Sequence, residues 1–255
     1  SIRPSPTVPQ FPFARALAAH TMNTPAALHP REALFESGEI APELPVCDHY
    51  CGVDLRMRKS LELQGEMGPV FDVTLDGEDG APVGGEIEHA HLIAELVNSP
   101  ANRFGRVGAR VQAIDHPAFE RMVDVIVGQA GARVAYITVP KPRHLADLQQ
   151  AIAAIDDAIE RHGVGRAIPV HALVETHGAL HDAHAMAAHP RIECLSFGLM
   201  DFVSAHRGAI PHSAMGAKGQ FEHPLVLRAK LDIAAACHAH GKTPSHCVVT
   251  EFKHL

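Results

Sequence analysis

The chain has 255 residues, of which 46% are hydrophobic and 20% are charged, and its formal net charge is −7. A chain of this length can bury a full core, the acidic balance argues against nucleic-acid partners, and no apolar run is long enough for a membrane helix. Five cysteines, an odd number, favour free thiols in a reducing cytoplasm.

Strand-like apolar segments alternate with amphipathic helical patterns along most of the chain. Strands are predicted over residues 44–52, 70–76, 106–112, 134–139, 168–174, 192–198 and 245–252. Helices are predicted over residues 54–65, 85–97, 116–129, 144–163 and 225–241, with another between the fifth and sixth strands. This α/β alternation favours a TIM (β/α)8 barrel over an open sheet. Only seven strands are predicted, so we expect that the eighth strand is formed by another part of the chain, such as the N-terminal region, or that this strand and a C-terminal segment are missing from these residues.

Two segments differ from this repeat. Residues 1–21 are rich in proline and lack a clear period, so we expect a flexible N-terminal extension before a single barrel domain over residues 22–255. Residues 204–220 contain several glycines and follow the sixth strand. Their position favours a lid or a loop that contacts substrate.

Two carboxylates stand at the ends of neighbouring predicted strands. Glu175 follows the fifth strand, and Asp201 follows the sixth. Parallel strands that are consecutive in sequence usually lie side by side, and their C-terminal ends form the catalytic edge of such folds. Two carboxylates with water molecules suit Mg²⁺ or Mn²⁺ and leave positions open for substrate oxygens. The pair therefore predicts a metal site that chelates a 2-oxo acid.

Further charged residues are predicted at the same edge. Asp76, Glu78 and Asp79 follow the second strand, and they either hold metal-bound water around the site or serve as caps and surface charges. Arg110 on the third strand offers a planar donor fork for a carboxylate or enolate oxygen. Lys141 after the fourth strand either pairs with a carboxylate and contacts substrate, or acts as a Schiff-base nucleophile.

Two clusters suggest a different metal site. His177, His181 and His184 fall on one face of the predicted helix after Glu175, where they form either a zinc site or a solvated surface. The segment CDHYC over residues 47–51 places Cys47, His49 and Cys51 on one face of the first strand. We interpret it as a barrel strand with His49 near the catalytic edge.

Five motifs in order, TLDGEDGA, GARVQ, ITVPKP, ALVETHGAL and LSFGLMDF, resemble the citrate lyase β-subunit-like branch of the HpcH/HpaI aldolase family over residues 44–252. The resemblance implies a TIM barrel, Mg²⁺ held by Glu175 and Asp201, and substrate contact by Arg110. It also implies a homotrimer or homohexamer that cleaves or forms a carbon–carbon bond between an acyl-CoA or pyruvate enolate and an oxo acid or aldehyde.

The chain departs from the family pattern at three places. The acidic turn reads DGEDGA rather than DLEDAV, the third strand reads RVQ rather than RVN, and nothing matches the C-terminal IHP-like segment. We expect a Mg²⁺-dependent lyase or aldolase acting on a 2-oxo acid or hydroxy-acyl-CoA. Arg110, Glu175 and Asp201 are its expected catalytic residues, with the amides of Leu199, Met200 and Asp201 on the substrate carboxylate. The alternatives are a CoA-independent pyruvate aldolase and a non-catalytic binding subunit or sensor.

Overall fold

The computed structural model describes residues 44–248, which belong to the compact unit Glu43–Leu255. The predicted N-terminal extension over residues 1–21 and the last residues of the seventh predicted strand lie outside the described residues. Within the described part, no helix is both long enough and apolar enough to span a membrane.

Seven parallel strands form one sheet in sequence order. They are β1 (Cys47–Cys51), β2 (Phe71–Asp76), β3 (Val107–Arg110), β4 (Ile137–Val139), β5 (Val170–Val174), β6 (Ile192–Phe197) and β7 (Thr243–Ser245). Each strand pairs with the next, and within residues 44–248 no pairing joins β7 to β1. The sheet therefore has the strand order of a TIM barrel that is open between its first and seventh strands.

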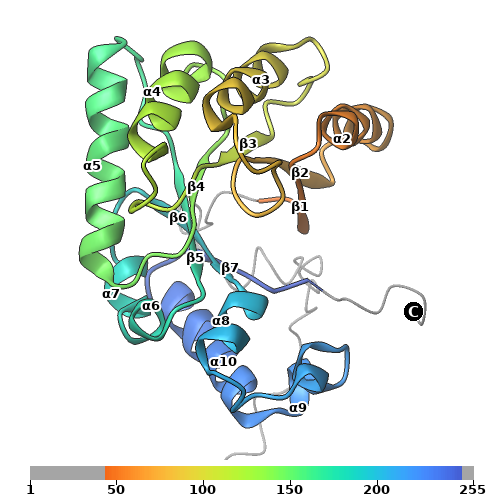
Figure 1. Cartoon of the computed structure of the whole chain (residues 1–255), viewed down its shortest axis with the longest axis vertical. Coiled ribbons are helices and arrows are strands. Elements are labelled where there is room, and N and C mark those ends of the chain that lie inside the picture. Colours follow the sequence, from red (N-terminus) through yellow and green to blue (C-terminus); the bar gives the residue numbers. More distant parts are fainter. Residues whose placement is uncertain (1–43, 249–255) are drawn as a thin grey trace, which may run out of the picture. The chain divides into compact units, whose positions relative to one another are not determined.

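Helices follow the strands on the outside of the sheet, as Figure 1 shows for α3, α4 and α5. The helical elements are α2 (Asp54–Met67), α3 (Glu86–Asn98), α4 (Phe119–Ala130), α5 (Leu145–Arg161), α6 (His177–His181), α7 (Ala183–Ala187), α8 (Leu199–Ala205), η1 (His212–Met215), α9 (Gly219–Glu222) and α10 (Pro224–Ala239). The alternation of parallel strands with outer helices confirms the predicted fold class.

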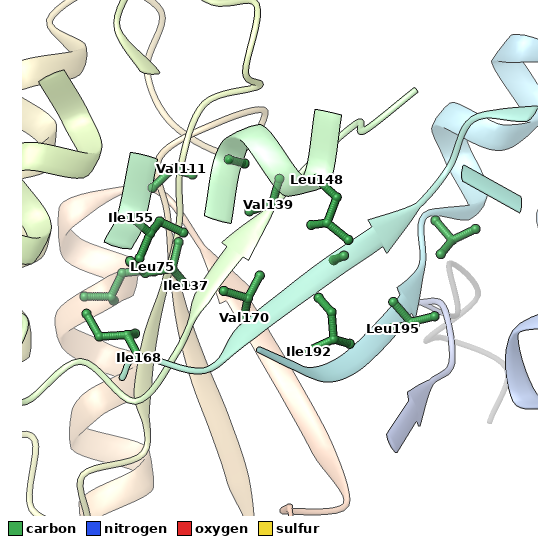
Figure 2. Close-up of a cluster of buried hydrophobic side chains, with 14 of the residues drawn as sticks. Leu75, Val111, Ile137, Val139, Leu148, Ile155, Ile168, Val170, Ile192 and Leu195 are labelled. Atoms are coloured by element: carbon green, nitrogen blue, oxygen red, sulfur yellow. The ribbon is translucent and has the colours of Figure 1, made fainter. Parts of the chain in front are cut away.

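The main core lies between the sheet and the outer helices. Figure 2 shows Ile137 and Val170 of neighbouring strands facing Leu148 and Ile155 of α5. These side chains are fully buried, and each contributes roughly 1.5–3 kcal/mol through removal of apolar surface from water. Because successive strand residues point to opposite faces, this core fixes which side chains enter the barrel interior.

The opposite face of the strands carries polar groups in the barrel interior. Thr74 Oγ1 lies 2.8 Å from Asp48 Oδ1 and 2.8 Å from the hydroxyl of Tyr136. The Tyr136 ring stacks on His171 with ring centroids 3.8 Å apart. A side chain at Gly108 would place its Cβ 2.2 Å from the Tyr136 ring, so glycine is required there. The interior is therefore a hydrogen-bonded network rather than the branched apolar layers usual in this fold.

Three predicted elements differ in the structure. The single helix predicted after Glu175 is divided into α6 and α7 at Asp182, whose carboxylate accepts the main-chain N–H of Leu145 at 2.8 Å. The loop predicted over residues 204–220 contains η1 and parts of α8 and α9. The seventh strand begins at Thr243, because Gly241 (φ 62°) turns the chain directly after α10.

Candidate active site

The C-terminal ends of five neighbouring strands, β2 to β6, bring the predicted site residues together. Asp76 ends β2, Arg110 ends β3, and Glu175 follows β5 directly. The others lie in the loops or the helix that come next in the chain: Glu78, Asp79, Lys141, Leu199, Met200 and Asp201. Asp201 does not end a strand as its motif suggested. It lies in the first turn of α8, because β6 stops at Phe197 and Gly198 separates the two elements.

Arg110 is fixed by two carboxylates. Its Nε lies 2.7 Å from Asp76 Oδ1 and its NH2 lies 2.5 Å from Asp76 Oδ2, while its NH1 forms an ion pair with Glu78 Oε2 at 2.9 Å. The guanidinium also lies over the ring of Tyr50, 5.3 Å from its centroid. Burial acts to lower the pKa of Arg110, but the bonds and charge of Asp76 outweigh it and raise this pKa. The side chain is a permanent cation at the edge of the barrel.

Asp76 also organises the acidic turn that follows β2. Its two carboxylate oxygens accept the main-chain N–H groups of Glu78 and Gly80, both at 2.9 Å. Both oxygens are also bound by Arg110. Asp76 is therefore a support for the turn and for Arg110, while Glu78 and Asp79 project toward Lys141.

Lys141 connects the acidic turn to the β5 and β6 side of the site. Its ammonium binds Glu78, lies 2.8 Å from Asp79 Oδ2, and is 3.8 Å from Asp201 Oδ2. Burial acts to lower the pKa of Lys141, but its bonds to Asp79 and Glu78 outweigh it and raise this pKa. A Schiff-base lysine needs a depressed pKa, so these contacts favour the predicted pairing with carboxylates.

Glu175 is the most buried acid on this side of the site, with 3% of its surface exposed. Its Oε1 accepts the main-chain N–H of Lys141 at 2.7 Å. Burial raises the pKa of Glu175 to about 7, and the negative charges of Asp201 and Glu78 act in the same direction. Such a carboxylate is stabilised by a cation, because the cation offsets both the burial and the repulsion.

Asp201 is near enough to Glu175 for its charge to act on the pKa of Glu175, and 41% of the Asp201 side chain is exposed. Leu199 beside it is buried, whereas Met200 is half exposed. A cavity of about 1120 Å³ opens at this edge, and its lining includes Asp79, Arg110, Glu175, Met200 and Asp201. The cavity extends down the open side of the barrel past Asp48, Tyr50 and His171. One pocket therefore joins the charged edge to the polar interior.

The alternative metal clusters do not assemble in the described residues. His177 Nε2 contacts the carbonyl oxygen of Ala205, and His181 is exposed at the end of α6. His184 lies beyond the break, on α7. His49 contacts Ser60 of α2 through Nδ1 at 2.8 Å rather than the catalytic edge. Over residues 44–248, no group of three His, Cys, Asp or Glu side chains has the arrangement of a metal site.

The sequence did not reveal the roles of two residues at the site. Tyr50 lies under Arg110, but a tyrosine within a short strand has no distinguishing pattern. Gly198 allows the close approach of Glu175, since a Cβ there would lie 2.1 Å from Glu175 Oε2. The FG pair within LSFGLMDF contains this glycine, but the motif alone does not show which side chain it accommodates.

Several known proteins resemble this chain over most of its length. A solved structure described as a citrate lyase from Burkholderia xenovorans LB400 is 54% identical with a TM-score of 0.82, covering 89% of this chain and 70% of that chain. A citrate lyase β subunit from M. tuberculosis, complexed with oxaloacetate and magnesium, is 18% identical with a TM-score of 0.62, covering 83% of this chain and 82% of that chain. The second likeness concerns the fold alone.

A curated relative, L-malyl-CoA/beta-methylmalyl-CoA lyase from Cereibacter sphaeroides, is 29% identical over 187 residues. The match covers 68% of this chain but only 57% of that relative. The sequence profile of the HpcH/HpaI aldolase/citrate lyase family matches residues 70–254, which is most of the chain. The family resemblance carried by the five motifs is thereby confirmed, and the chain belongs to the HpcH/HpaI aldolase/citrate lyase family.

Proposed function

We propose that this protein is a Mg²⁺-dependent carbon–carbon lyase or aldolase that acts on a hydroxy-acyl-CoA or a 2-oxo acid. The observation that carries the proposal is the buried Glu175, which lines one cavity together with Asp201 and the fixed cation of Arg110 and whose pKa the charge of Asp201 helps to raise. The citrate lyase and malyl-CoA lyase relatives support the reaction type. A citryl- or malyl-CoA thioester is the substrate class that we propose.

Glu175 and Asp201 are the proposed ligands of Mg²⁺, with Mn²⁺ as a substitute. Their chemistry fits, because hard divalent cations prefer carboxylate oxygens and the mutual repulsion of this pair raises the pKa of Glu175 together with burial. Solved relatives contain magnesium with oxaloacetate, or magnesium with acetoacetate and coenzyme A. When bound, the metal supplies a Lewis acid for the negative charge that develops on the substrate oxygen.

Arg110 is proposed to bind the same substrate oxygen or a substrate carboxylate. A guanidinium has five N–H donors, of which Asp76 binds that of Nε and one of NH2, while Glu78 binds one of NH1. One N–H on each terminal nitrogen is not used by these two carboxylates. Because both partners hold the side chain rigidly, its remaining donors are oriented before substrate arrives. The positive charges of Arg110 and Lys141 also offset part of the surrounding negative charge, which favours an anionic substrate.

We propose that the substrate carboxylate binds at the first turn of α8. The first N–H groups of a helix have no partner within the helix, and here they belong to Leu199, Met200 and Asp201. Met200 and Leu199 also line the cavity. We further propose that the protein works in the cytoplasm as a homotrimer or homohexamer, following its family.

The test is an assay of the purified protein with citryl-CoA, malyl-CoA and related thioesters, with and without Mg²⁺. We expect release of an acyl-CoA and an oxo acid that stops on addition of EDTA and returns with excess Mg²⁺. Calorimetry with oxaloacetate, glyoxylate and pyruvate measures binding separately. Turnover that survives EDTA would refute the metal role, and Mg²⁺-dependent binding without any release would instead support a non-catalytic binding subunit or sensor.

A further inference from the structure

The carboxylate of Glu175 lies in a slot between two segments of main chain. On one side, the N–H of Lys141 donates to Glu175 Oε1 at 2.7 Å. On the other side, Gly198 is so close that an added Cβ would lie 2.1 Å from Glu175 Oε2 and 2.6 Å from the Cβ of Glu175. One oxygen is therefore oriented by a hydrogen bond, and the other by lack of space.

Gly198 is needed for its size rather than for its backbone conformation. Its dihedral angles, φ −85° and ψ 79°, are not in the left-handed region that favours glycine. Its N–H donates to the carbonyl oxygen of Val174 at 3.1 Å, next to Glu175, which fixes the distance between the two segments. Any side chain at this position must displace Glu175 or separate β5 from β6.

Lys141 differs from Gly198 in both respects, because there is room for its side chain but its backbone conformation is strained. Its φ of 51° lies in the left-handed region, which a residue with a Cβ rarely occupies. The conformation is held by the ammonium contacts to Glu78 and Asp79 and by Thr176, which donates to the carbonyl oxygen of Pro142 at 2.8 Å. Backbone strain that is held by several contacts is common where a functional group must be oriented.

We propose that the Lys141 peptide and Gly198 are positioning elements that hold Glu175 in the orientation required for metal binding. The inference rests on the proposed role of Glu175 as a metal ligand. Pre-orientation removes the entropy cost of ordering the ligand when the metal binds, and partners that orient a ligand commonly change metal affinity by about 10–100-fold. Neither residue offers a side chain that would ligate a cation, because Gly198 has none and Lys141 carries an ammonium.

The first experiment compares Gly198→Ala with Gly165→Ala, using calorimetric titration of the metal-free protein with Mn²⁺. Gly165 is a matched control because an added Cβ there meets no atom within 4 Å. We expect Mn²⁺ affinity to fall at least tenfold in Gly198→Ala and to stay within twofold of the parent in Gly165→Ala. A folded Gly198→Ala variant with the parent affinity would overturn the inference.

A second comparison does not depend on the folding of Gly198→Ala. Lys141→Gly and Lys141→Val both remove the ammonium and both keep the main-chain N–H, but only glycine adopts a φ near 51° without strain. We expect Lys141→Val to bind Mn²⁺ several-fold more weakly than Lys141→Gly. Equal affinities of the two variants would show that the left-handed conformation does not orient Glu175.

Glu175→Gln separates failure of this inference from failure of the proposed function. If Glu175→Gln binds Mn²⁺ as the parent does, Glu175 is not a ligand and the proposed function is wrong at its centre. If Glu175→Gln loses binding while Gly198→Ala and Lys141→Val retain it, the metal site stands and the positioning role is refuted. We expect all three variants to bind more weakly, with Glu175→Gln the most affected.

Discussion

The guanidinium of Arg110 is bound by both carboxylate oxygens of Asp76, at 2.7 and 2.5 Å. Arg106 binds both carboxylate oxygens of Asp72 at the same two distances, 2.7 and 2.5 Å. Each of these residues lies four positions before its counterpart, Arg106 before Arg110 and Asp72 before Asp76, at the other end of the paired strands β2 and β3. In this fold, the C-terminal end of the strands carries chemistry and the N-terminal end carries stability. The two pairs therefore allow a structural role and a functional role to be compared within one sheet.

The first prediction compares Asp76→Asn with Asp72→Asn. Asp72→Asn leaves Arg106 without its ionised partner, so we expect the free energy of unfolding to fall by about 3 kcal/mol. Asp76→Asn leaves Arg110 paired with Glu78 alone, so we expect a smaller fall. Only Asp76→Asn should also weaken oxo-acid binding, because only Arg110 lies beside Glu175 and Asp201 in the cavity. Urea unfolding and calorimetry with oxaloacetate measure the two effects. Equal weakening of binding by both variants would contradict a substrate role for Arg110.

The second prediction concerns the two proposed metal ligands. Glu175→Gln and Asp201→Asn should each reduce Mg²⁺-dependent turnover by at least a hundredfold, because one carboxylate alone holds the ion weakly. His181→Ala is the control, since its side chain is exposed on α6. The measurement is kcat at saturating thioester over a range of Mg²⁺ concentrations. Comparable losses in all three variants would mean that the site has been misplaced.

The sequence predicted the positions of those site residues that lie at recognisable strand ends. Glu175 and Arg110 directly follow or end apolar strands, so the strand-end rule placed both at the same edge. Asp201 was harder to place, because the seven residues of α8 are too few to show a helical period. Its strand was predicted correctly, whereas its location on a helix was not.

Other features depend on contacts that no local pattern records. The left-handed backbone of Lys141 is held by Glu78 from the turn after β2, and its hydrogen bond to Glu175 joins the segments that follow β4 and β5. The division of α6 from α7 at Asp182 depends on the start of α5. The polar barrel interior was also missed, because the inward residues of β2 alternate with apolar ones that satisfy the core pattern.

The third prediction concerns Lys141 as a candidate nucleophile. Its ammonium binds Glu78 and Asp79, and its pKa is raised, so little free amine is present at neutral pH. Incubation with pyruvate or oxaloacetate and borohydride should therefore leave no covalent adduct on Lys141. Mass spectrometry of the peptides checks this directly. Recovery of a reduced adduct at Lys141, together with turnover in EDTA, would favour a metal-free aldolase.

The fourth prediction is a pH dependence of stability that originates at Asp48. Burial, opposed by the bond from Thr74 and reinforced by the charge of Asp72, raises the pKa of Asp48 from 3.8 to about 7. Between these two values the unfolded state ionises Asp48 while the folded state keeps it protonated. The favourable contribution of this group is therefore complete below pH 4 and is lost progressively as the pH rises to 7.

Asp48→Asn removes this ionisation and keeps an oxygen that can accept from Thr74 and Tyr136. We expect the variant to be more stable than the parent at pH 8, by roughly 1–3 kcal/mol, because Asp48 lines the cavity and is partly solvated. The difference should shrink as the pH falls and should be small at pH 4. Urea unfolding at pH 4, 6 and 8 provides the measurement. A difference that does not change with pH would show that Asp48 ionises normally in the folded protein.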